Sequence, residues 1–173
     1  MKRIFDYLEA RPDLSAKTII IVTGDHGEEF FEKGRLGHNS AFVEEQIRTP
    51  LVIHVPGQGH NVVTHITSHT DIVATLAPLL GVRNNASDYT VGQSLFSPDY
   101  DRKAYMVCGW DTAILMTKDY KCELPVGKKS FFSKELITRR DDSACTKEEI
   151  KSFWEKNTQQ LYKAQQDISR FED

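Results

Sequence analysis

The feature that most constrains the fold is an unbroken run of β-branched residues at positions 18–23, Thr-Ile-Ile-Ile-Val-Thr. Such a run is typical of a strand covered on both faces, as in a parallel sheet flanked by helices. Polar and glycine residues follow directly, as Gly24-Asp25-His26-Gly27. Because ligands of open α/β sheets bind at the carboxyl ends of strands, we expect a central strand that delivers Asp25 and His26 to a functional site.

Helical and extended patterns alternate through the first hundred residues. The expected elements are a helix that stops near Pro12, strands at 50–55 and 62–66, and a helix from Ser68 to Gly81 that is capped with the help of Asp71. The segment 28–46 is too irregular for one long helix and has the character of an active-site loop. This order predicts a mostly parallel α/β sheet, with the strand at 50–55 in the same sheet as the strand at 18–23.

The second half of the chain has a different pattern. Short strands are expected at 104–108, 112–117 and 121–124, spaced as in an antiparallel meander. A closing helix is expected from Lys147, because Thr146 and Glu149 form a capping box ahead of a helical apolar repeat. We therefore predict an α/β part at 1–103, and at 104–173 a small antiparallel sheet with a C-terminal helix, packed on the same domain.

Charge and cysteine content exclude several classes of protein. The chain has 22 basic and 25 acidic residues, a net charge of −3, and no block of like charges, so nucleic acid is not an expected partner. No apolar run is long enough for a membrane span or a signal-peptide core. The three cysteines lack metal-binding spacing, and whether Cys108 and Cys122 pair across a predicted hairpin is left open.

Asp25 and His26 carry the clearest chemical signal. An adjacent carboxylate and imidazole at the end of a strand suit a divalent metal, zinc or manganese more than calcium, which prefers oxygen ligands. The alternative is that Asp25 caps a helix that continues through Gly27-Glu28-Glu29, with His26 simply exposed. His38 lies further along the predicted loop, where the chain can fold back over the strand end.

In this order the motifs resemble the C-terminal part of the sulfatase family of the alkaline phosphatase superfamily. The resemblance covers roughly Met1 to Phe96 and rests on TIIIVTGDHGEEF, GHNS, RTPLVIHVPG, TSHTDIVATLAPLLGV and DYTVGQSLF. Phosphoethanolamine transferases and lipoteichoic acid synthases belong to the same group. Within it, the chain is most similar to bacterial inner-membrane sulfatase-like proteins, whose periplasmic domain follows several membrane helices.

The resemblance implies a fold, a reaction class and roles for three residues. The fold is the C-terminal portion of an alkaline-phosphatase-like sandwich, and the reaction is metal-dependent hydrolysis or transfer of sulfate or phosphate esters, some of them lipid-linked. Asp25 and His26 would be metal ligands, and His38 would lie beside the phosphate or sulfate of the substrate, or at a second metal. Many sulfatases have a lysine near this position. The histidine at position 38 therefore makes the chain more similar to the phosphotransferases of the superfamily.

Family members also use an upstream acidic ligand and an upstream Thr, Ser or formylglycine nucleophile. We therefore expect these 173 residues to be part of a longer, membrane-anchored periplasmic protein, to bind metal weakly by themselves and to be inactive without the N-terminal half. The alternative function is a non-catalytic lipid-binding or regulatory module of the bacterial envelope. Residues encoded upstream of Met1 would distinguish the two.

Overall fold

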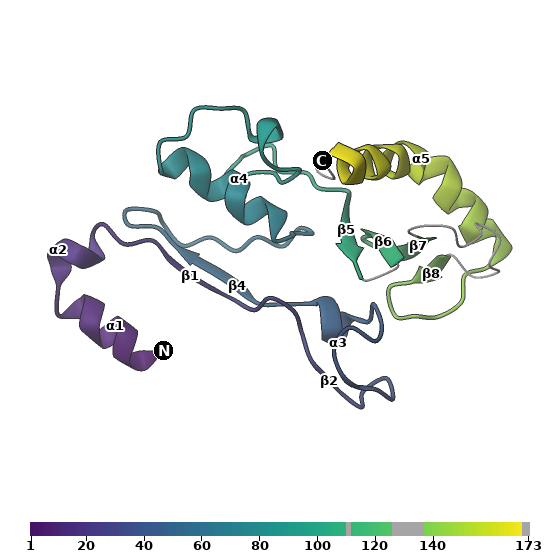
Figure 1. Cartoon of the computed structure of the whole chain (residues 1–173), viewed down its shortest axis with the longest axis horizontal. Coiled ribbons are helices and arrows are strands. Elements are labelled where there is room, and N and C mark those ends of the chain that lie inside the picture. The colour runs from purple at the N-terminus through teal and green to yellow at the C-terminus, as the bar shows by residue number, and fades with distance from the viewer. Residues whose placement is uncertain (110–111, 126–136, 171–173) are drawn as a thin grey trace. The chain divides into compact units, whose positions relative to one another are not determined.

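The computed structural model of the chain describes residues 1–109, 112–125 and 137–170 (Figure 1). Two compact units are present, Met1–Val62 and Val63–Asp173. The predicted division into 1–103 and 104–173 stays a prediction, and positions 110–111, 126–136 and 171–173 of its second part lie outside the described residues. Each unit is described separately below.

The first unit begins with two short helices, of which the amphipathic pattern predicts the first. Helix α1 spans Lys2–Glu9 and buries Leu8. Helix α2 spans Pro12–Ser15 and has its proline in the first turn, where the missing backbone N–H costs no helical hydrogen bond. The predicted stop near Pro12 is therefore confirmed for α1.

Strand β1, Ile20–Thr23, and strand β4, Leu51–His54, lie side by side in a two-stranded antiparallel sheet (Figure 1). The strand positions were predicted correctly, but the parallel sheet was not, since every strand pair among the described residues is antiparallel. A parallel return needs a crossover, usually a helix packed on the sheet. The chain between β1 and β4 instead forms a hairpin and one short helix, so it re-enters in the opposite direction.

The predicted burial of β1 on both faces and between neighbouring strands is also wrong for the residues described. β1 and β4 pair only with each other there, so each has an unpaired edge, and the side chains of β1 alternate between half-buried and exposed. A run of β-branched residues indicates strand propensity, but it does not specify the number or direction of neighbouring strands.

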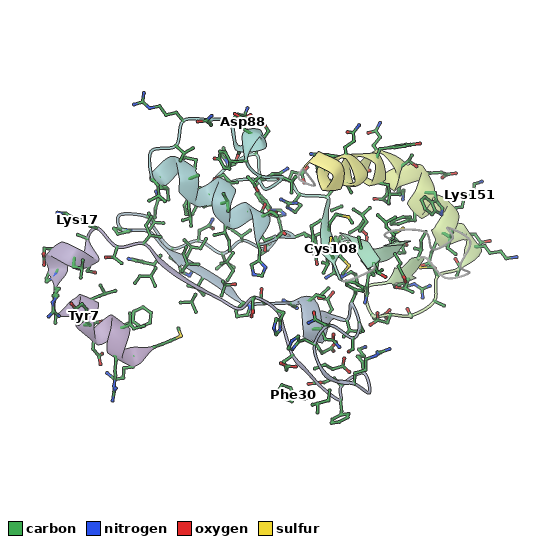
Figure 2. The ribbon with its side chains drawn as sticks, viewed as in Figure 1. Tyr7, Lys17, Phe30, Asp88, Cys108 and Lys151 are labelled. Carbon is green, nitrogen blue, oxygen red and sulfur yellow. The ribbon has the colours of Figure 1, made fainter. Side chains whose placement is uncertain are left out.

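The predicted active-site loop is more ordered than its composition suggests. Strands β2, Glu29–Phe30, and β3, Leu36–Gly37, form a small hairpin, and helix α3 follows at Glu44–Ile47. The side chain of Phe30 extends outward from this hairpin (Figure 2) and is 67% exposed. The hairpin and α3 together determine the positions of the site residues.

The second unit opens with helix α4, Thr70–Leu79. The expected strand at 62–66 is absent, and the backbone there forms no ladder. Asp71 accepts a hydrogen bond from the backbone N–H of Ser68 at 2.8 Å, which is one half of the predicted capping interaction. A single 3₁₀ turn, η1, follows at Ala86–Asp88.

A four-stranded antiparallel meander, in the order β5-β6-β7-β8, and a long helix complete the second unit. The strands are Ala104–Cys108, Thr112–Thr117, Tyr120–Pro125 and Ile137–Arg139, and the helix is α5, Lys147–Arg170. The core of this unit contains Leu115, Cys122 and Ile137 from the sheet and Phe153 and Ala164 from α5. The predicted meander and closing helix are confirmed.

Two further sequence-based questions concern the pairing of the cysteines and the presence of a membrane-spanning helix. Cys108, Cys122 and Cys145 are all free thiols, so the pairing that the sequence left open does not occur in this structure. Burial raises the pKa of the Cys122 thiol to about 12. Within the described ranges, no helix combines the length and the apolar character needed to cross a bilayer.

Candidate active site

The site begins where the chain leaves β1 and packs against α3. The N–H of Gly27 donates to the carbonyl of Gln46 at 2.8 Å. A β-carbon at position 27 would lie 2.1 Å from the carbonyl oxygen of Glu45 and 3.0 Å from that of Arg48. Only glycine permits this approach, so Gly27 fixes the path of the loop that carries Asp25 and His26.

A buried polar pair, Glu29 and Gln46, supports the loop from below. Their exposed fractions are 0% and 3%. The amide of Gln46 donates to Glu29 Oε2 and to Ser40 Oγ, each at 2.8 Å, and Glu29 Oε1 accepts from the backbone N–H of Lys33 and Arg35. Burial acts to raise the pKa of Glu29, but the hydrogen bonds from Gln46, Arg35 and Lys33 outweigh it and lower that pKa below its ordinary value.

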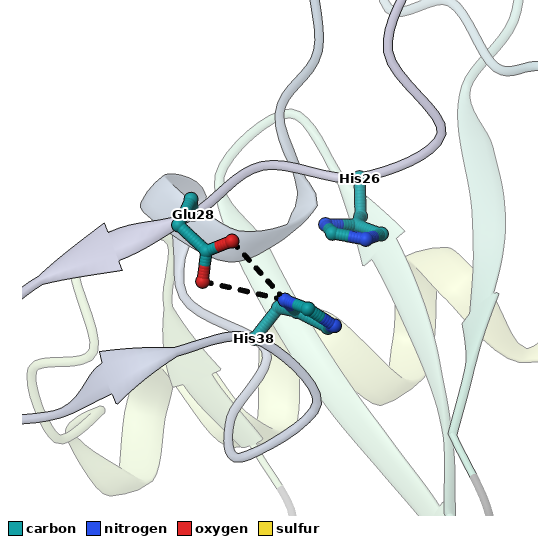
Figure 3. A group of neighbouring side chains, drawn as sticks. All are labelled: His26, Glu28 and His38. Carbon is teal, nitrogen blue, oxygen red and sulfur yellow. Dashed lines mark hydrogen bonds and ion pairs between the residues drawn. The ribbon is translucent and has the colours of Figure 1, made fainter.

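Three side chains meet above this support: His26, Glu28 and His38 (Figure 3). Each offers one nitrogen or oxygen atom, and these atoms lie within 4.8 Å of one another. The pairing of Glu29 with Gly37 in the β2–β3 hairpin brings the preceding Glu28 opposite the following His38. A local hairpin thus joins residues that lie ten positions apart in the sequence.

The contacts within the cluster fix both imidazole rings. His38 Nδ1 lies 3.2 Å from Glu28 Oε2 and 3.3 Å from Oε1. His26 Nδ1 lies 2.8 Å from the carbonyl oxygen of Gly27. The two rings stack, with centroids 3.8 Å apart and planes inclined by 29°. Because a carbonyl only accepts hydrogen bonds, the Nδ1 of His26 is the protonated nitrogen, and in the neutral ring Nε2 carries the lone pair.

Asp25 lies beside His26 but outside the three-residue cluster. Its side chain is 92% exposed, and its Oδ2 lies 3.7 Å from His26 Nε2. The backbone N–H of Asp25 and the neighbouring His26 hold the pKa of this carboxyl below its ordinary value. The carboxylate therefore stays ionised and accessible next to the free nitrogen of His26.

The structure brings together two of the three residues singled out in the sequence, His26 and His38, and places Asp25 next to His26. Glu28 and Glu29 were not recognised as site residues. The signal for Glu28 was the turn at Gly34 between two short extended segments, since a hairpin centred there brings 28 and 38 face to face. The burial of Glu29 depends on Gln46, which comes from a different element.

Comparison with known proteins finds a family match over the segment that holds this site. Residues 1–82 match the model of the family described as Sulfatase. That matching segment contains Asp25, His26, Glu28 and His38.

The relatives are much longer than this chain. Two proteins described as inner membrane protein YejM, from Salmonella typhimurium (strain LT2) and Salmonella typhi, are each 33% identical over 82 residues. This stretch is 46% of the present chain but only 13% of each relative.

The fold is shared with a solved structure described as BT4656 in complex with its substrate D-glucosamine-2-N,6-O-disulfate. The TM-score is 0.70 at 20% sequence identity, over 99% of this chain and 38% of that one.

Proposed function

We propose that this chain belongs to a metal-dependent hydrolase or transferase that acts on sulfate or phosphate esters. The observation that carries the proposal is the convergence of His26, Glu28 and His38 beside Asp25, within the segment that matches the sulfatase family. The match to the sulfatase family and the sulfated sugar bound by BT4656 support this substrate class. A lipid-linked ester belongs to the same class, and the description of the relatives as inner membrane proteins supports a protein that works at the membrane.

Asp25 and His26 are the proposed metal ligands, and their geometry fits a divalent ion. The Nε2 of His26 is left with its lone pair because Nδ1 donates to Gly27. Two ligands bonded to one zinc ion at tetrahedral angles lie roughly 3.3 Å apart. The observed 3.7 Å between His26 Nε2 and Asp25 Oδ2 is close to that value. Zinc or manganese suits this mixed nitrogen and oxygen pair better than calcium does.

His38 is the proposed catalytic residue. Its Nδ1 is bonded to Glu28, so Nε2 is the atom that can bind an ester oxygen or transfer a proton to a leaving group. The face-to-face contact with His26 keeps this imidazole beside the proposed ligands. A bound divalent ion would lower the pKa of the nucleophile and would offset the negative charge that develops on the ester oxygens.

Turnover of sulfate and phosphate esters by the full-length protein tests the proposal. Asp25→Ala and His26→Ala should each remove nearly all activity. His38→Ala should lower the rate by about 10²–10³, the scale for one positioned group that stabilises charge or moves a proton. His60→Ala, which removes an exposed imidazole of the same unit, is the matched control and should be normal.

Two outcomes would contradict the proposal. Full activity in His38→Ala would remove His38 from the site. A full-length protein that binds lipid but turns over no ester with zinc or manganese present would instead support the non-catalytic envelope module.

A further inference from the structure

We propose that Glu28 is a positioning residue, which holds His38 in the tautomer and orientation that its proposed catalytic role requires. Nothing in the family match assigns a role to this carboxylate. The inference rests on the proposed function for the role of His38, but the contact between Glu28 and His38 can be tested without any activity.

The first step is the contact itself. Both carboxylate oxygens of Glu28 lie within 3.3 Å of the same atom, His38 Nδ1. An ionised carboxylate only accepts hydrogen bonds, so Nδ1 of His38 carries the proton and Nε2 is left as the proton acceptor. Figure 3 shows the carboxylate facing the Nδ1 edge of the ring. The proton position on His38 is therefore determined by Glu28.

The second step is the rigidity of the arrangement. Glu28 and His38 lie opposite each other next to the paired residues Glu29 and Gly37, so the backbone sets their separation. The next residue, Glu29, is anchored in the buried network with Gln46. On its other side His38 is covered by the stacked ring of His26. His38 is thus held from two directions, by a hydrogen bond and by a ring contact.

A shared metal ion is the competing explanation for the three-residue cluster, and the ring geometry argues against it. An imidazole nitrogen directs its lone pair within the plane of the ring, and zinc lies about 2.0–2.1 Å from that nitrogen. Two stacked rings 3.8 Å apart, with planes only 29° apart, do not direct their lone pairs at one ion so close to both. Asp25 also lies outside the cluster. The geometry therefore favours one histidine on the metal and the other held by Glu28.

The direct test is nuclear magnetic resonance of the imidazole nitrogens in the ¹⁵N-histidine-labelled chain, with the pH raised until the neutral tautomers are resolved. His38 should show the Nδ1–H tautomer in the wild-type chain. Glu28→Ala should shift it toward the Nε2–H form that predominates in free imidazoles, whereas Glu28→Gln, whose amide oxygen still accepts, should retain part of the Nδ1–H form. Glu9→Ala removes an exposed acid of the same unit, outside the hairpin, and should change nothing.

Kinetics of the full-length protein complete the test. Glu28→Ala should lower kcat by about 10–100-fold with little change in KM, the scale for losing a group that orients a histidine, and Glu28→Gln should recover part of the loss. An unchanged His38 tautomer, or unchanged kcat in Glu28→Ala where His38→Ala is impaired, overturns the inference. Weaker zinc binding with an unchanged tautomer would also overturn it and assign Glu28 to the metal. Normal turnover in His38→Ala would instead contradict the proposed function. The tautomer measurement would still test whether Glu28 contacts His38.

Discussion

The imidazole rings of His26 and His38 lie face to face, with centroids 3.8 Å apart. They come from opposite ends of the β2–β3 region, one from the loop after β1 and the other from the end of β3. The contact connects the proposed metal ligand to the proposed catalytic residue. Removing either ring should therefore alter the contribution of the other ring to stability.

A double-mutant cycle measures this connection. We expect the losses of unfolding free energy in His26→Ala and His38→Ala to be coupled by about 0.5 kcal/mol, at the low end for aromatic pairs because both rings are partly exposed. Urea denaturation of the wild type, the two single variants and the double variant gives the coupling. Strict additivity would show that the stacked arrangement is not held in solution.

Gly27 provides a second prediction, on the close approach of the site loop to α3. Gly27→Ala should lower stability by about 1–3 kcal/mol, the usual range for overpacking, because the new β-carbon would meet the carbonyl oxygen of Glu45. Gly59→Ala is the matched control, since nothing lies within 4 Å of the position that its β-carbon would occupy. Thermal unfolding of both variants makes the comparison. Equal melting temperatures would contradict the observed packing.

Local signals predicted the second unit well. The capping box of α5 forms in full, with Thr146 N–H donating to Glu149 Oε2 at 2.7 Å and Glu149 N–H donating to Thr146 Oγ1 at 3.2 Å. The meander was predicted from turn residues between short segments that are extended in character. Each of these features depends on residues that are close in sequence, so the sequence pattern contains the information needed.

Features that depend on distant residues were predicted less well. The direction of β4 relative to β1 is decided by what the intervening segment becomes, not by either strand. Asp71 shows the same limit, because the capping pattern identified its bond to Ser68 but not its burial against Arg102, 31 positions away. Glu28 was overlooked because its role appears only once the hairpin is known.

Asp71 itself gives a third prediction. Its carboxylate is fully buried and accepts from Gln93 N–H and from the hydroxyl of Tyr100, each at 2.8 Å, and from the guanidinium of Arg102. Burial, and then Asp71, raise the pKa of Tyr100 to about 12. Asp71→Ala leaves Arg102 without its buried counter-charge, so we expect a loss of about 3–5 kcal/mol.

Asp101→Ala is the control for Asp71. Asp101 forms a solvent-exposed ion pair with Lys103, and its loss should cost about 0–1 kcal/mol. Trp154 lies in α5 of the second unit, so denaturation followed by tryptophan fluorescence reports on the stability of that unit. Similar midpoints for the two variants would contradict the burial of Asp71.

The last prediction concerns acid stability and Glu149. Hydrogen bonds from Arg139, and then from the backbone N–H of Thr146, lower the pKa of this carboxyl from 4.5 to about 2. Arg139 donates to both of its oxygens, at 2.9 and 2.6 Å. The folded-state pKa is below the unfolded value, so the contribution to stability is complete above about pH 4.5 and is lost as the pH falls toward 2.

Unfolding by urea, measured by tryptophan fluorescence between pH 6 and 2, should therefore show a decline in the free energy of unfolding that is smaller in Glu149→Gln than in the wild type. Glu148→Gln changes the neighbouring acid in the same first turn of α5 and should keep the wild-type decline. The same pH dependence in Glu149→Gln as in the wild type would show that the pair with Arg139 does not stabilise the start of α5.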